Sequence, residues 1–221
     1  MSGAWAGYAA AVHRIDSDDD VAAGVRALIE REPRFREVRD VAGRIDLRRR
    51  APGFEGLVWI ITGQMISLGA AEAIWGRTRA ALGGVEAARV LEVDDAVLRA
   101  AGQSRAKVVA MREAARAVVD GSLDFRRVAA LGDEEGAEEL MRVRGVGAWT
   151  AAMYLLACEG RSDVWPCGDV ALRTAVGRAF GFGRRVDEGE MIEIGEVWRP
   201  WRAVAARVLW GYYRRLGELE A

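Results

Sequence analysis

Apolar residues recur at helical spacing along most of the chain, whereas β-branched residues seldom alternate with polar ones. A spacing of three or four residues collects apolar side chains on one face of a helix, so the pattern predicts an all-α protein. Capping residues, glycines and prolines mark where the helices should begin and end. We expect helices after Ser17 up to Pro33, over residues 54–61 and 70–82, after Asp94, from Ser104 to Gly121, from Asp133 to Met141, over residues 149–156, after Asp187, and over residues 201–216 with Pro200 in the first turn.

One stretch, residues 140–169, combines a tight glycine turn with two flanking helical segments. Gly145 and Gly147 surround a single apolar residue, and without a Cβ atom they let the backbone reverse sharply and approach a ligand closely. The first amides of the following helix have no intrahelical partner, so they can bind a phosphate. Asp169 then stands where a further helix should begin, and taken alone it reads as an ordinary N-cap residue.

Four motifs in this chain resemble those of the helix-hairpin-helix (HhH-GPD) DNA glycosylase superfamily. Residues 143–151 (VRGVGAWTA) resemble its hairpin, and residues 163–169 (DVWPCGD) resemble its loop with the catalytic aspartate. Residues 198–202 (WRPWR) and 63–67 (GQMIS) resemble signatures of the 3-methyladenine DNA glycosylase II (AlkA-type) branch. A single Gly-x-Gly is weak evidence, but four motifs in the family's order are strong evidence.

The resemblance implies a two-lobed all-α fold with the active-site cleft between the lobes. Residues 53–160 would form a helical lobe that ends in the helix-hairpin-helix. Residues 1–52 would pack with the C-terminal part, residues 161–221, which carries the catalytic Asp and the Trp-Pro-Trp segment. Few residues precede Pro52 and they show a helical pattern, so we expect no extra N-terminal mixed domain.

The resemblance makes Asp169 the catalytic residue. Cleavage of an N-glycosidic bond builds positive charge on the sugar, and a fixed carboxylate stabilises that charge and positions a water molecule. Trp149 occupies the position where the lyase branch of the superfamily carries its nucleophilic lysine. Lys107 is the only lysine of the chain. We therefore expect a monofunctional glycosylase that uses water and has no AP-lyase activity.

The resemblance also assigns a base pocket and a wedge. Trp149, Trp201 and Met153 match positions that line the pocket, where an electron-rich ring face attracts a cationic alkylated purine. Gln64 and Met65 match the segment that fills the gap left by the extruded nucleotide. Packing in the hydrophobic core remains an alternative for both tryptophans and for Met65.

The hairpin is expected to grip one DNA strand through the backbone at Arg144, Gly145, Val146 and Gly147. By resemblance, a monovalent cation (Na or K) would be held by the backbone carbonyl groups of Met141, Val143 and Val146. We expect no required cofactor. The expected partner is double-stranded DNA containing alkylated bases, bound by a monomer.

Composition narrows these hypotheses. A net charge of −1 argues against a generic charge-driven nucleic-acid binder, and it predicts modest, salt-sensitive binding to undamaged DNA. Two cysteines, Cys158 and Cys167, exclude a four-cysteine iron–sulfur cluster and favour a reducing compartment. The sequence shows no signal peptide and no membrane span, so we expect a cytoplasmic protein, nucleoid-associated if bacterial. His13, the only histidine, is expected to be a surface or capping residue.

Three functions remain in order of preference. The first is a monofunctional alkylbase DNA glycosylase of base-excision repair. The second is a non-catalytic helix-hairpin-helix DNA-binding module, which would need neither Asp169 nor an aromatic pocket. The third is a glycosylase with AP-lyase activity, which the missing lysine and cluster cysteines oppose.

Overall fold

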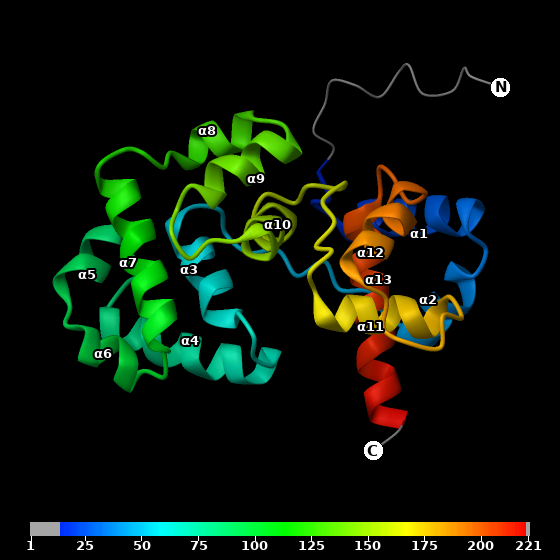
Figure 1. The fold of residues 1–221 in the computed structure, drawn as a ribbon, viewed down its shortest axis with the longest axis horizontal. Coiled ribbons are helices and arrows are strands. Elements are labelled where there is room, and N and C mark those ends of the chain that lie inside the picture. Colours follow the sequence, from blue (N-terminus) through cyan, green and yellow to red (C-terminus); the bar gives the residue numbers. More distant parts are fainter. Residues whose placement is uncertain (1–13, 220–221) are drawn as a thin grey trace.

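The computed structural model describes residues 14–219, and His13 lies outside the described residues. Helices make up most of this part of the chain, so the all-α prediction is confirmed (Figure 1). None of the helices within residues 14–219 is both long and apolar enough to cross a membrane. The thirteen helices of the described residues are α1 (Asp18–Arg31), α2 (Phe35–Ala42), α3 (Phe54–Gly63), α4 (Leu68–Leu82), α5 (Ala87–Glu92), α6 (Asp95–Ala100), α7 (Arg105–Val119), α8 (Phe125–Ala130), α9 (Asp133–Met141), α10 (Ala148–Ala157), α11 (Val170–Ala179), α12 (Glu188–Glu196) and α13 (Arg202–Leu219).

The helices form two lobes (Figure 1). In one lobe α7 packs against α3 and α5, and α9 packs against α8 and α10. In the other lobe α13 packs against α1, α2 and α11, so helices from both ends of the chain share one core. Helix α10 lies on the side of the first lobe that faces the second. The start of this helix, directly after the hairpin, therefore lies between the lobes.

Side-chain caps fix several helix starts at the expected residues. The Ser17 hydroxyl accepts a hydrogen bond from the Asp20 amide, and the Ser104 hydroxyl accepts one from the Lys107 amide. Asp187 caps α12 in the same way. The Ser67 hydroxyl caps α4, which therefore begins two residues earlier than the apolar pattern predicted. Each such cap satisfies an amide that the helix leaves unpaired.

Two features of the chain differ from the sequence prediction. Pro200 is not in the first turn of the last helix, because α13 begins at Arg202 and the Trp201 carbonyl accepts the first hydrogen bonds of that helix. The Arg199–Pro200 peptide bond is cis. Helices α2, α5 and α8 were not predicted. They have only 8, 6 and 6 residues, and no side chain caps α2 or α5.

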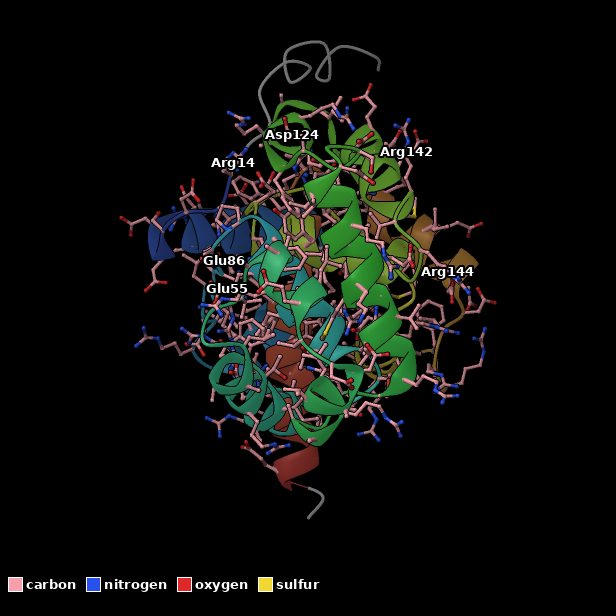
Figure 2. The ribbon with its side chains drawn as sticks, turned by 90° about the vertical axis from the view of Figure 1, so that its left-hand side faces the viewer. Arg14, Glu55, Glu86, Asp124, Arg142 and Arg144 are labelled. Carbon is pink, nitrogen blue, oxygen red and sulfur yellow. The ribbon has the colours of Figure 1, made fainter. Side chains whose placement is uncertain are left out.

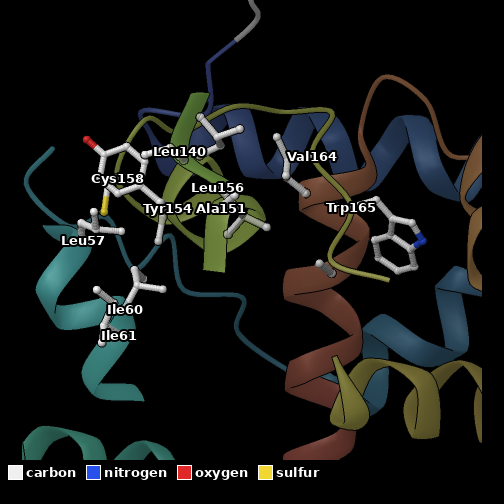
Figure 3. Packing of buried hydrophobic residues seen from close by; sticks show 14 of the residues in the cluster. Leu57, Ile60, Ile61, Leu140, Ala151, Tyr154, Leu156, Cys158, Val164 and Trp165 are labelled. Carbon is white, nitrogen blue, oxygen red and sulfur yellow. The ribbon is translucent and has the colours of Figure 1, made fainter. Parts of the chain in front are cut away.

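The contact between α3 and α10 forms the core next to the hairpin. Figure 3 shows Leu57, Ile60 and Ile61 of α3 beneath the α10 segment that carries Tyr154. Tyr154 is fully buried, and its hydroxyl accepts a hydrogen bond from the Gly53 amide at 2.7 Å. Burial raises the pKa of the Tyr154 phenol above its ordinary range. The phenol therefore fixes the start of α3 against α10 as a neutral hydrogen-bonding group.

Candidate active site

Asp169 caps the N-terminus of α11 and is held by three donors. Its Oδ1 accepts a hydrogen bond from the Leu172 amide at 2.9 Å and from Trp210 Nε1 at 3.2 Å. Its Oδ2 accepts one from Trp149 Nε1 at 2.9 Å. All three partners donate, so they fix the orientation of the carboxylate. The amides at the start of α11 place the partial positive charge of a helix N-terminus beside it.

Asp169 lies in the wall of a cavity of about 740 Å³ between the two lobes. The cavity combines an apolar interior with a charged rim. Its aromatic lining comes from three helices and its rim from the segment before α3 and the end of α13. The lining residues are Trp59, Trp149, Trp210 and Tyr213; Leu47, Ile60, Ile66, Leu68, Met153 and Leu156; Gly63, Ser67, Ala71, Ala157 and Ala171; and Asp46, Arg48, Arg49, Arg50, Glu72, Asp169, Arg207 and Arg214.

The structure brings Trp149 and Met153 to this cavity but not Trp201. Trp201 packs against α1, where a Cβ atom added to Gly24 would come within 2.7 Å of the indole. Trp198, the first tryptophan of the same segment, is buried with its ring centroid 5.1 Å from that of Phe35. The Trp-Pro-Trp segment therefore belongs to the core of the second lobe, and the prediction that Trp201 lines a base pocket is corrected.

Trp210, and not Trp201, lines the cavity beside Asp169. It lies on α13 three residues before Tyr213, so both rings share one helix face and both line the cavity. This spacing is visible in the sequence, but it does not tell which face of the helix meets the cavity. Because Trp210 also donates to Asp169, the aromatic lining and the carboxylate form one hydrogen-bonded unit.

Trp59 is a second lining residue that the sequence analysis missed. The guanidinium of Arg50 lies over its ring, 4.1 Å from the centroid, and also forms an ion pair with Glu72. A cation above an indole face is a favourable contact. The sequence pattern gave no sign of it, because the apolar run of α3 predicted a buried tryptophan.

Met65 is not a core residue. It lies between α3 and α4 with 94% of its side chain exposed and a φ of 58°, a left-handed conformation that residues other than glycine rarely adopt. Gln64 does not project in the same way. Its Nε2 donates to the Gly145 carbonyl at 3.3 Å and to the Thr150 hydroxyl at 2.8 Å. The Met65 loop is thereby tied to the hairpin.

The hairpin itself depends on close packing at one glycine. Gly145 has a φ of 90°, and a Cβ atom there would meet that of Ala110 on α7 at 2.5 Å. Gly147 caps α10, whose first intrahelical hydrogen bond runs from the Ala151 amide to the Gly147 carbonyl. The amides before Ala151 therefore precede the helical ladder. The Val146 side chain is buried, so only its backbone can reach a ligand.

Two arginines just before this turn lie on one edge of the molecule (Figure 2). Arg142 forms an ion pair with Glu139 at 2.9 Å, and its side chain remains 74% exposed. Arg144 is exposed as well. Both arginine side chains add positive charge next to the turn, although the whole chain is nearly neutral.

Lys107 is buried away from this cavity. Its Nζ donates to the Thr62 carbonyl at 2.8 Å, and burial lowers the pKa of the amine. The residue is not part of the cavity lining. A lysine with a carbonyl partner inside a lobe is a structural group.

Comparison with known proteins agrees with this geometry. The structure of Schizosaccharomyces pombe 3-methyladenine DNA glycosylase (Mag1) in complex with abasic DNA matches with a TM-score of 0.79 and 23% identity, over 85% of this chain and 95% of that chain. A DNA-3-methyladenine glycosidase from Bacillus halodurans matches with a TM-score of 0.74 and 30% identity, over 93% of this chain and 94% of that chain. A Bacillus subtilis relative, YfjP, bears the name of a DNA-3-methyladenine glycosylase and is 26% identical over 121 residues, which cover 55% of this chain and 42% of that protein.

Fold and site together define a two-lobed helix-hairpin-helix protein with a capped aspartate in its interlobe cavity. The family model of the HhH-GPD superfamily base excision DNA repair proteins matches residues 58–200. The matched region contains the hairpin, Asp169 and the Met65 loop. The chain belongs to this superfamily.

Proposed function

We propose that the protein is a monofunctional DNA glycosylase of base-excision repair that extrudes alkylated purines of the 3-methyladenine type and hydrolyses their N-glycosidic bonds. The observation that carries the proposal is the Asp169 carboxylate, fixed by three N–H donors in the wall of an aromatic cavity. The names of the relatives from Bacillus halodurans and Schizosaccharomyces pombe support this class of substrate.

The chemistry follows from where the carboxylate is held. As the bond between C1′ and the base nitrogen breaks, its electron pair leaves with the base and the sugar becomes cationic. The fixed anion of Asp169 stabilises that cation without reorganising, because its three donors already hold it. Water then adds to C1′ while the carboxylate accepts a hydrogen bond from it, and one proton of that water passes to the solvent to leave a C1′ hydroxyl. A base that is already cationic departs as a neutral molecule, which makes it the easier leaving group.

The cavity suits an extruded purine. Its volume of about 740 Å³ lies within the usual range of roughly 300–1,000 Å³ for small-molecule sites. The rings of Trp149 and Trp210 offer electron-rich faces beside the carboxylate, and a cationic base gains more from such faces than a neutral one. Met153 adds a polarisable apolar wall.

The hairpin would hold the DNA backbone through the amides around Gly145 and Gly147. A monovalent cation fits the carbonyl groups of Met141, Val143 and Val146, since neutral oxygens suit Na or K. The Val143 carbonyl accepts one hydrogen bond, from the Val146 amide at 3.0 Å, and keeps a second lone pair for an ion. Such an ion would add positive charge beside the strand.

A lyase step finds no support. The only lysine of the chain, Lys107, donates to the Thr62 carbonyl inside the first lobe. Trp149 occupies the position after the hairpin and uses its indole N–H on Asp169. We therefore propose water, and not a protein amine, as the nucleophile.

The test uses duplex DNA treated with a methylating agent and incubated with the protein. Released bases are identified by chromatography, and strand breaks are counted on a denaturing gel with and without borohydride. Release of methylated purines without strand breaks or a trapped complex supports the proposal. Folded protein that binds DNA but releases no base would instead be a binding module, and a borohydride-trapped complex would indicate a lyase.

The role of Trp210 can be separated from that of Trp201. Trp210→Phe keeps an aromatic ring but removes the indole N–H that reaches Asp169, so we expect base release to slow by about tenfold, the usual effect of losing a hydrogen bond to a charged group. Trp201→Phe is the matched control and should leave the rate unchanged, because that ring packs on α1. Single-turnover rates measure both. Equal losses in the two variants would contradict the assignment of Trp210.

Met65 is proposed as the wedge. Met65→Ala should slow base release from duplex DNA by roughly tenfold, because an apolar side chain that fills the vacated stack is lost. Release from single-stranded DNA should not change, since no stack has to be filled there. The unfolding midpoint should also stay constant, because the side chain is 94% exposed. An equal loss on both substrates would place Met65 in another role.

A further inference from the structure

Five arginines line the active-site cavity, and three of them are used inside the protein. Arg207 donates to the backbone carbonyls of Leu47, Ala203 and Leu156. Arg49 donates to the carbonyls of Ile15 and Cys158 and pairs with Asp16. Arg50 stacks on Trp59 and pairs with Glu72. These three side chains stabilise the wall of the cavity. The remaining two are Arg48 and Arg214.

The side chains of Arg48 and Arg214 are exposed at the rim, and their guanidinium groups have few partners within the protein. Among the described residues, the Arg48 guanidinium pairs only with the Asp46 carboxylate, at 3.4 Å, with both side chains nearly half exposed. Within residues 14–219, no hydrogen bond or ion pair joins Arg214 to another group. Burial lowers the pKa of Arg214, and so does the nearby charge of Arg48. The positive charges of Arg48 and Arg214 thus lie close enough to oppose each other, while the carboxylates of Asp46 and Glu218 attract Arg214.

The backbone is strained where it holds Arg48 in this position. Its φ of 48° is left-handed, and within residues 14–219 only Met65 shares that conformation among residues other than glycine. The turn lets Arg49 reach inward to the Cys158 carbonyl while Arg48 stays at the rim. Arg214 reaches the same rim from the far end of α13. Two unrelated segments therefore deliver one guanidinium each to the mouth of one cavity.

We propose that Arg48 and Arg214 form a clamp for a DNA phosphate next to the extruded nucleotide. The clamp rests on the proposed function, because it requires a nucleotide in the cavity. A nucleotide whose sugar lies at Asp169 carries a phosphodiester on each side of that sugar. The rim of the cavity is where one of those phosphates must stay when the base enters. Guanidinium groups match phosphate oxygens in charge and geometry.

The clamp differs from the hairpin in when it acts. The hairpin amides can bind the backbone of any duplex. The rim arginines line the cavity itself, so they meet a phosphate closely only once a nucleotide has left the stack. Arg48 and Arg214 therefore contribute to binding of extruded states and not to binding of intact duplex, and they stabilise the flipped nucleotide against return.

The experiment compares two duplexes, one undamaged and one with a tetrahydrofuran abasic analogue, over a range of salt concentrations. The double variant Arg48→Gln, Arg214→Gln should bind the abasic duplex roughly tenfold more weakly, with the salt slope reduced by about 0.9, because the contact to one phosphate is lost. Binding to undamaged duplex should not change. The variant Arg48→Lys, Arg214→Lys should keep the salt slope, since it keeps both charges.

Matched controls come from neighbouring arginines outside the cavity. Arg44→Gln with Arg215→Gln removes the same charge from the same two segments, where Arg44 is 83% exposed and Arg215 pairs with Glu218 at 2.7 Å. This control should keep the abasic affinity. Equal weakening on both duplexes, or weakening by the control as well, would overturn the clamp in favour of general surface charge. Unchanged abasic binding in a folded double variant would also overturn it. These binding results do not depend on base release, so a failure of the proposed function is seen separately.

Discussion

Asp169→Asn is expected to lower the rate of base release by roughly 10³-fold, a loss typical of removing a preorganised group that stabilises transition-state charge. Asparagine is as good an N-cap as aspartate, so α11 should keep its start and the protein its stability. The amide has only one acceptor oxygen, whereas Asp169 uses Oδ1 and Oδ2 to accept from two indoles. One indole N–H would then face an NH₂ group, so the variant also loosens Trp149 or Trp210.

Single-turnover base release and chemical denaturation measure the two effects separately. Asp187→Asn is the matched control, because Asp187 caps α12 in the same way and does not line the cavity. It should retain full activity. Asp169→Ala should be inactive and also less stable by about 1 kcal/mol, since it removes the cap. Activity of Asp169→Asn within tenfold of the wild type would contradict the catalytic role of the carboxylate.

Gly145→Ala is expected to destabilise the protein by about 2–4 kcal/mol and to weaken binding to every duplex. The added Cβ atom would meet Ala110 at 2.5 Å, and a φ of 90° is unfavourable for any residue with a side chain. Strained backbone and overpacking each cost about 1–3 kcal/mol. The clash is with the Cβ atom of Ala110, which is bonded directly to the α7 backbone, so neither side can move away without shifting the hairpin or α7.

Gly147→Ala provides the control within the same turn. Its φ is −95°, and a Cβ atom there would meet nothing within 4 Å. We expect a change of less than about 1 kcal/mol in the free energy of unfolding, since an alanine lacks only the modest N-cap preference of glycine. Urea denaturation and duplex-binding titrations test both variants. Similar stability for the two would show that the hairpin does not depend on its contact with α7.

Features set by neighbouring residues were predictable from the sequence. Helix starts at Ser17, Ser104 and Asp187 follow from hydrogen bonds between a side chain and an amide three residues later. The glycine turn follows from conformations that only glycine adopts easily. Asp169 was singled out because residues 163–169 resemble the superfamily's loop with the catalytic aspartate, and the same residue caps α11 in the structure.

Features set by packing between segments distant in the sequence were not predictable. Trp201 and Trp210 both lie at or in α13, and periodicity gives no means of deciding which ring faces the cavity and which faces α1. The choice depends on how α13 is rotated against α1 and α2. The stack of Arg50 on Trp59 likewise joins a loop and a helix face whose meeting is decided by the tertiary fold. Helix α2 lacks a cap and forms because it packs on α13.

The two hydrogen bonds that Gln64 donates fix the position of the Met65 loop relative to the hairpin. Because the Gln64 amide donates to both the Gly145 carbonyl and the Thr150 hydroxyl, the loop that carries Met65 is held in place against the glycine turn. Under the proposed function, each seating of the hairpin on a strand offers one nucleotide for inspection, at a constant offset. The protein then searches DNA in discrete steps. It reaches the next nucleotide only when the whole protein shifts its position on the strand.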